Sequence, residues 1–306
     1  MRRGPLSLPS SLVRLLDEHA LRLMQPPDGP PVDFANPAGE AALLAADSVS
    51  WRTFKNPVTV FIGGVAAVIL ELAEPAVRAG VWTHSSFKTD PLRRMQRTGL
   101  AAMSTVYGPA SRTKAMIARV VRMHGHVTGT TEHGQPYQAN DVDLLTWVHA
   151  TATWGFAAAY SRYVEPLDDG ALQRLYTEAR PAAQLYGAAN PPTDPAQMRA
   201  LFARMRNRLE PSPVILEFLS IMRAAPILPA PVRRAQGLLV GAAVELIDAD
   251  LRARLALDAG QGLSRWQRLL VDRIAGIAER TLLPTSPAVQ SCLRLGLPRD
   301  YLYVGA

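Results

Sequence analysis

The helical spacing of apolar residues constrains the fold of this chain more than any other feature of its sequence. From Pro57 onward, long segments with apolar side chains three and four residues apart alternate with short breaks of Pro, Gly, Asn or Asp. The strict alternation of apolar and polar residues that marks a half-buried strand is nearly absent. With 306 residues, 48% of them hydrophobic, the chain can bury a large core. We therefore predict an all-α fold, a single-domain multi-helix bundle.

The breaks between the periodic segments divide the chain. The proline-rich passage at residues 26–37 cannot continue a helix, so residues 1–50 are expected to form an N-terminal helical arm and linker. Residues 51–306 are expected to form the all-α domain. Two Asp-Pro pairs, beginning at Asp90 and Asp194, are typical helix starts. Helices are expected over residues 12–24, 58–70, 111–128, 140–163, 198–209 and 232–257, and from residue 91, with a long loop at 186–195.

Charge, cysteine content and hydropathy exclude several classes of protein. Basic residues outnumber acidic ones by 33 to 26, but they are scattered along the chain, so we expect no nucleic-acid binding. The longest apolar run, residues 58–70, is shorter than the roughly 20 residues that a bilayer needs, so we expect no transmembrane segment. The single cysteine, Cys292, and the lack of an apolar leader after the basic N-terminus favour a cytoplasmic protein. The sequence leaves homo-oligomerisation open.

Helical geometry separates two neighbouring histidines. The neighbours of His124 at three, four and seven residues on the expected helix include four apolar side chains, those of Ile117, Val120, Val121 and Val127. His126 lies about 200° further round the helix, among arginines, and is expected to face water. We therefore predict that His124 faces the core from a buried helix.

A buried His124 has two interpretations. It is either a core histidine bonded to a backbone carbonyl or a ligand, since an unpaired buried imidazole costs about 1 to 3 kcal/mol. A zinc site is weakly supported, because there is no cysteine partner and no His-Glu-x-x-His spacing. A cofactor that needs a single protein ligand, such as haem, suits an isolated histidine better.

Polar side chains on other helices offer further candidate sites. On the helix from Pro91, Arg94, Arg97 and Thr98 share a face with small residues, and this face is either an anion-binding wall or an ordinary solvated side. His149 has half-polar helical neighbours and either lines a cavity or has a structural role. His84 follows the apolar helix near the start of the Arg94 helix, so we place it at the edge of the same pocket.

The order and spacing of several motifs resemble one known family. In chain order the motifs are Asn56-Pro57 with Gly63-Gly64, Gly80-Val81-x-x-His84-Ser85-x-Phe87, Asp90-Pro91-x-x-Arg94-x-x-Arg97-Thr98, Tyr107-Gly108, Arg122-Met123-His124-x-x-Val127-x-Gly129, Gly134-x-Pro136-Tyr137-x-x-x-Asp141 and Trp147-Val148-His149-Ala150-Thr151. Over roughly residues 50–225, this set resembles the catalytic domain of the MpaB and latex clearing protein (rubber oxygenase) family.

The resemblance implies an all-α fold that binds b-type haem and, in the characterised relatives, cleaves carbon–carbon double bonds of isoprenoid chains with dioxygen. It implies that His124 is the axial ligand of the haem iron. It also places Arg94, Arg97 and Thr98 on the distal side of the cofactor.

The sequence departs from the rubber oxygenases near the ligand. These relatives carry arginines three residues before and four residues after the ligand, where this chain has Val121 and Thr128. Their distal glutamate has two candidates here, Glu71 and Glu74, and the sequence does not choose between them.

The first hypothesis is therefore a haem b-dependent oxygenase that acts on an apolar, isoprenoid or lipid-like small molecule with dioxygen. In it, His124 ligates the iron, Arg94 and Thr98 orient dioxygen, and Arg97 balances charge. His84 edges the distal pocket, and His149 contributes to the cofactor pocket. The alternatives are a non-catalytic helical protein that binds haem or lipid, and an interaction module without a cofactor.

Overall fold

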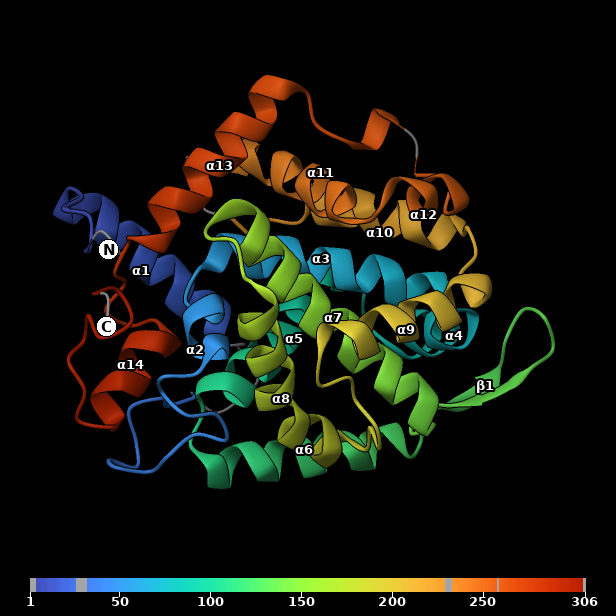
Figure 1. Cartoon of the computed structure of the whole chain (residues 1–306), viewed down its shortest axis with the longest axis horizontal. Coiled ribbons are helices and arrows are strands. Elements are labelled where there is room, and N and C mark those ends of the chain that lie inside the picture. Colours follow the sequence, from blue (N-terminus) through green and yellow to red (C-terminus); the bar gives the residue numbers. More distant parts are fainter. Residues whose placement is uncertain (1–3, 26–31, 229–232, 258, 305–306) are drawn as a thin grey trace.

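The computed structural model describes residues 4–25, 32–228, 233–257 and 259–304. Within these residues the chain forms fourteen α-helices, three short 3-10 helices and one antiparallel hairpin, which confirms the all-α prediction (Figure 1). In chain order the elements are α1 (Ser10–Met24), α2 (Val49–Phe54), α3 (Pro57–Ala73), α4 (Pro75–His84), α5 (Pro91–Tyr107), α6 (Ala110–His124), β1 (Thr128–Thr130), β2 (Pro136–Gln138), α7 (Val142–Tyr163), α8 (Asp169–Tyr186), α9 (Pro195–Met205), η1 (Arg206–Arg208), α10 (Pro213–Ala224), η2 (Arg233–Ala235), α11 (Gln236–Leu246), α12 (Ala249–Arg254), η3 (Ala259–Gln261), α13 (Arg265–Glu279) and α14 (Pro287–Arg294).

Helices α3 and α7 pack against each other at the centre of the molecule (Figure 1). Helix α3 is apolar on nearly every side because α7, α10, α11 and α13 all pack around it. Gly63 of α3 meets Gly155 of α7, and a Cβ atom added at Gly63 would lie only 2.5 Å from the Gly155 carbonyl oxygen. The two glycines therefore allow the backbones of the central helices to touch.

The remaining helices form outer layers on both sides of this pair. In Figure 1, α10 to α13 cover one side, α6 and α8 lie on the other, and the β1–β2 hairpin projects from one end. A second apolar cluster joins α2, α5 and α14 and contains Trp51, Tyr107 and Cys292. The Trp51 indole donates a hydrogen bond of 2.9 Å to the Val106 carbonyl, and Tyr107 donates one of 2.7 Å to the Trp51 carbonyl.

The helix expected over residues 111–128 ends earlier, at His124. Gly125 caps α6 with its backbone N–H, and the chain then turns into the hairpin. Only Thr113 and Ile117 of α6 are fully buried, so the prediction of a buried helix is wrong. Helix α6 is instead an amphipathic surface helix with one face directed inward, and His124 is its last residue.

The helix expected over residues 232–257 is also interrupted. It forms α11 and α12, because the chain is extended at Ile247 and the Asp248 side chain caps a new helix through the Leu251 N–H, 2.9 Å away. Residue 232, and residues 26–31 of the proline-rich linker, lie outside the described residues.

Among the described residues, no single helix has the length and apolar character needed to cross a membrane. Helices α3 and α4 have the required length and apolar character only when they are taken together, and the chain bends by 109° between them.

Candidate functional site

Arg94 lies in the first turn of α5 and is held by side chains from its own segment. The Asp90 carboxylate caps this helix by accepting a hydrogen bond of 3.2 Å from the Arg93 N–H. The Arg94 guanidinium donates to the Thr98 hydroxyl one turn later and lies over the Phe87 ring, 5.1 Å from the ring centroid. Arg94 is half-buried, so its charge acts through protein rather than bulk water.

His124 is the last residue of α6 and is half-buried. Its Nδ1 atom is buried and has no hydrogen-bond partner among the described residues. Burial, and secondarily the positive charge of Arg94, lower the pKa of His124 below its ordinary value. The imidazole is therefore neutral at pH 7. His126, two residues later, is exposed, as the helical geometry predicts.

Glu71 lies in the last turn of α3 and is half-buried. The Thr151 hydroxyl of α7 lies 3.3 Å from Glu71 Oε1 and 2.9 Å from the Val148 carbonyl oxygen. Burial raises the pKa of Glu71 to about 7, although the Thr151 hydrogen bond and the charge of Arg94 both lower it. A carboxyl group in this state exchanges a proton near neutral pH.

The second glutamate candidate, Glu74, has a different role. Its Oε2 accepts a hydrogen bond of 2.8 Å from the Val77 N–H and so caps α4, and its Oε1 lies 2.7 Å from Arg208 Nη2. Both oxygens are therefore engaged in holding the fold. Of the two glutamates, Glu71 is the one whose charge interacts with Arg94.

Arg94 is the common element of these observations, because its charge acts on both His124 and Glu71. These interactions link one cation of α5, one titrating carboxyl of α3 and one neutral imidazole of α6, with one hydroxyl from α5 and one from α7. We call Glu71, Arg94, Thr98, His124 and Thr151 the Arg94 group.

Three other predicted site residues, Arg97, His84 and His149, are not included in the Arg94 group. Arg97 is exposed and acts on Arg94 as a like charge that lowers its pKa. His84 is exposed at the end of α4. Burial lowers the pKa of His149 to about 4, and its Nε2 lies 3.3 Å from the Thr153 hydroxyl of the same helix. The roles predicted for these three residues stay predictions.

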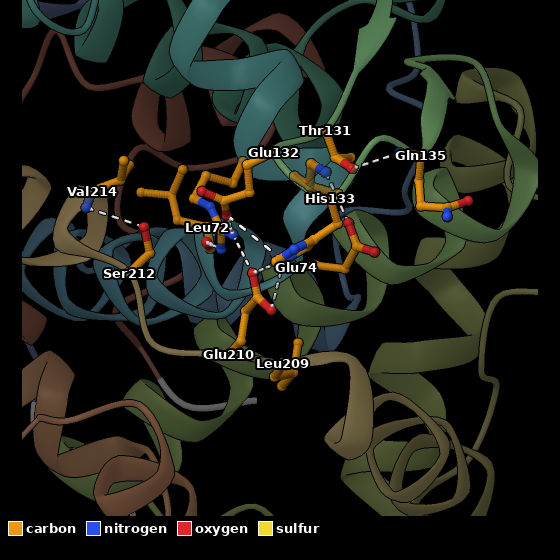
Figure 2. A network of polar contacts seen from close by, with 12 residues as sticks. Leu72, Glu74, Thr131, Glu132, His133, Gln135, Leu209, Glu210, Ser212 and Val214 are labelled. Carbon is orange, nitrogen blue, oxygen red and sulfur yellow. Dashed lines mark hydrogen bonds and ion pairs between the residues drawn. The ribbon is translucent and has the colours of Figure 1, made fainter.

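A second polar cluster holds the hairpin against the body of the protein (Figure 2). Buried Arg78 of α4 donates to the Leu72 carbonyl, 3.0 Å away, and to the carboxylates of Glu132 and Glu210. His133 Nε2 lies 3.0 Å from Glu210 Oε1. The ligand atoms of Glu132, His133 and Glu210 lie within 4.8 Å of one another, which is close enough for a metal ion. Arg78 already pairs with both carboxylates, however, so the cluster is better explained as a structural ion-pair network, and we call Arg78, Glu132, His133 and Glu210 the Arg78 clasp.

Comparison with known proteins identifies the family to which the chain belongs. The model of one family, described as "ER-bound oxygenase mpaB/B'/Rubber oxygenase, catalytic domain", matches residues 51–280. The chain belongs to this family. No curated protein and no solved structure matches it. The match extends beyond the motifs quoted above, through α10 and α11 to the end of α13, and it includes every residue of the Arg94 group.

In this member of the mpaB/rubber oxygenase family, sequence reasoning missed the partners that hold the Arg94 group. Thr151 and Phe87 appear in the quoted motifs, but their contacts with Glu71 and Arg94 depend on how the helices cross. The signal for Glu71 was a lone carboxyl within an almost wholly apolar helix, where an ionisable group removed from water needs a reason to be there.

Proposed function

We propose that this family member is a haem-dependent oxygenase that acts on an apolar, isoprenoid or lipid-like substrate with dioxygen. The observation that carries the proposal is the buried Nδ1 of His124, which lacks a hydrogen-bond partner among the described residues and belongs to an imidazole whose pKa is lowered by burial and by the charge of Arg94. Neutral imidazole is the form of histidine that ligates iron. The family membership supports oxygenase chemistry in general, and haem is the cofactor that an isolated histidine ligand suits.

The residues of the Arg94 group fit a b-type haem. His124 would supply a nitrogen ligand to the iron, and the half-buried Arg94 guanidinium would supply a cation for a propionate or for a developing negative charge. When bound, the haem would supply the activation of dioxygen. Val121 and Thr128 stand where the rubber oxygenases carry arginines, so Arg94 is the cation most directly available to the group.

Glu71 would move protons in this site. Below about pH 7 its carboxyl holds a proton, and above that pH it is a carboxylate that can accept one. The Thr151 hydroxyl has a single proton and lies closer to the Val148 carbonyl than to Glu71. When the hydroxyl donates to Glu71 Oε1 instead, it stabilises the carboxylate form and lowers the pKa of Glu71, against the larger effect of burial. Thr151 is therefore a positioning residue that fixes the orientation of the acid.

Apolar side chains around the group favour an apolar substrate. The Arg94 guanidinium lies over the Phe87 ring, and Leu92 and Met95 of the same helix as Arg94 pack against the main apolar core. Cleavage of one carbon–carbon double bond consumes one dioxygen molecule and yields two carbonyl groups. Such a reaction requires no charged substrate group, which agrees with these surroundings.

The absorption spectrum of the purified protein tests the proposal. We expect a Soret band after expression with a haem precursor, and loss of this band in His124→Ala. His126→Ala is the matched control, since His126 is an exposed histidine two residues away, and it should keep the wild-type spectrum. A wild-type protein without bound haem, or a His124→Ala variant with an unchanged spectrum, would refute the assignment.

Turnover requires a separate measurement. The haem-loaded protein should consume dioxygen when given a polyisoprenoid, and the products should carry the new carbonyl ends. Glu71→Gln should retain the Soret band and lose most of the turnover. Haem binding without any product would instead favour a non-catalytic haem protein.

A further inference from the structure

Helix α13 carries apolar side chains on its outer side as well as on its inner side. Val271 and Ala275 are buried against the core. On the other side, Trp266 is 63% exposed, Leu269 66%, Leu270 39% and Ile277 51%. Four large apolar residues in water on a single helix of 15 residues call for an explanation. Helix α13 lies at the outer edge of the molecule, on the side opposite α6 (Figure 1).

The exposed residues of α13 form one continuous face. Positions 266, 269, 270, 273 and 277 follow the spacing of three and four residues that places side chains on one side of a helix. Arg273 lies within this face, and exposed Arg265 lies at its N-terminal end. We call Arg265, Trp266, Leu269, Leu270, Arg273 and Ile277 the α13 face.

The acidic residues of α13 are ion-paired, and Asp272, three residues after Leu269, lies beside the α13 face. Asp272 pairs with Arg162 of α7 across 3.2 Å, and Glu279 pairs with Lys55 across 2.5 Å and accepts a hydrogen bond from Tyr160. The α13 face therefore combines apolar side chains with two cations, and the carboxylate at its border, that of Asp272, is already paired with Arg162. This combination is complementary to a surface that is negatively charged outside and apolar just beneath.

We propose that the α13 face docks on the surface of a lipid bilayer that contains anionic lipids. The helix lies in the plane of the interface, with Leu269, Leu270 and Ile277 among the upper acyl chains. Trp266 lies at the level of the headgroups, where an indole finds both apolar and polar neighbours. Arg265 and Arg273 contact lipid phosphates. The docking is peripheral, because α13 inserts one face and remains packed on the core by the other.

A second copy of the chain fits this face less well. A helix of 15 residues is about 22 Å long, so two such helices side by side bury less than the roughly 1,000 Å² of a stable interface. In a two-fold contact, Arg273 would also lie near its own copy, and the neighbouring carboxylate of α13, that of Asp272, is already paired with Arg162. The bilayer surface satisfies both the apolar side chains and the arginines.

Flotation with lipid vesicles tests the proposal on the full chain. We expect the protein to float with vesicles of phosphatidylcholine containing one third phosphatidylglycerol, and to float much less with phosphatidylcholine alone. The Trp266→Glu/Leu269→Glu variant should bind the anionic vesicles at least about tenfold more weakly, because it replaces inserted apolar groups with carboxylates. Arg265→Gln/Arg273→Gln should remove most of the preference for anionic lipid.

The matched control is Val142→Glu/Leu185→Glu, which changes two exposed apolar residues on α7 and α8 and should leave flotation unchanged. Circular dichroism and the thermal midpoint verify that each variant is folded. Absence of wild-type flotation with anionic vesicles would overturn the proposal, as would an equal loss in the control. A wild-type dimer that becomes monomeric in Trp266→Glu/Leu269→Glu, without any vesicle binding, would show that the face joins two copies. None of these outcomes depends on haem, so the proposed oxygenase function is tested separately.

Discussion

Glu71 has a pKa of about 4.5 when surrounded by water and of about 7 in the folded protein. The folded state holds the proton more tightly, so protonation of Glu71 stabilises it. This contribution is fully present below pH 4.5 and is lost as the pH rises through 7. We predict that, between pH 5 and pH 8, wild-type protein loses about 2 to 3 kcal/mol of unfolding free energy relative to Glu71→Gln. Urea unfolding at several pH values measures the difference.

Glu217 provides the control for this measurement, because it is an exposed glutamate on the surface of α10. Glu217→Gln should follow the wild-type curve at every pH. A difference between wild-type protein and Glu71→Gln that stays constant from pH 5 to pH 8 would show that Glu71 does not titrate in this range.

The residues of the site differ in how far the sequence could predict them. Helical periodicity selected His124 over His126, because the neighbours that decide this choice lie within a few positions in the chain. Glu71 and Thr151 are 80 residues apart, and their contact depends on how α3 crosses α7. The periodicity of apolar residues predicts which face of a helix is apolar, but it does not predict which other helix will cover that face. For this reason the choice between Glu71 and Glu74 needed the fold.

At the scale of elements, the crossing of α3 and α7 depends on the glycines that separate their backbones. A Cβ atom at Gly63 would lie 2.5 Å from the Gly155 carbonyl oxygen, so the helices would have to move apart. We predict that Gly63→Ala lowers the free energy of unfolding by roughly 3 kcal/mol, as overpacking of a rigid backbone contact does. Thermal or urea unfolding measures this loss.

The adjacent Gly64 offers a close control within the same helix. A Cβ atom at Gly64 would meet only the Phe156 ring, at an ordinary contact distance of 3.7 Å. Gly64→Ala should therefore be neutral or stabilise the protein by up to about 1 kcal/mol, since alanine favours helix more than glycine. Equal losses in the two variants would show that helix crossing does not explain the Gly63 effect.

Element boundaries explain where the sequence-based prediction was wrong. Residues 111–128 keep a helical apolar spacing through Val127, yet α6 ends at His124 because the following residues pair as a hairpin. Thr128 pairs with Gln138 and Thr130 with Pro136, contacts between segments that the helical period does not reveal. The helix starts were easier to predict, because Asp90 and Asp194 each precede a proline and cap the helix locally.

At the scale of the whole molecule, the Arg78 clasp joins three segments that are distant in the chain. Arg78 comes from α4, Glu132 from the hairpin turn and Glu210 from the segment between η1 and α10. The Glu210 N–H also donates to the Ala73 carbonyl at the end of α3, 3.0 Å away. The hairpin begins four residues after His124, so the clasp fixes the chain that leaves the candidate iron ligand.

We predict that Arg78→Met lowers the free energy of unfolding by roughly 2 kcal/mol, because it leaves two carboxylates near each other without their buried cation. Amide hydrogen exchange should accelerate over residues 125–138, which the clasp holds against α4. Arg162→Met is the matched control, because the Arg162–Asp272 ion pair is exposed and its loss should cost less than about 1 kcal/mol. If Arg78→Met changed stability no more than this control, or left exchange in the hairpin unchanged, the clasp would not be what anchors the segment after His124.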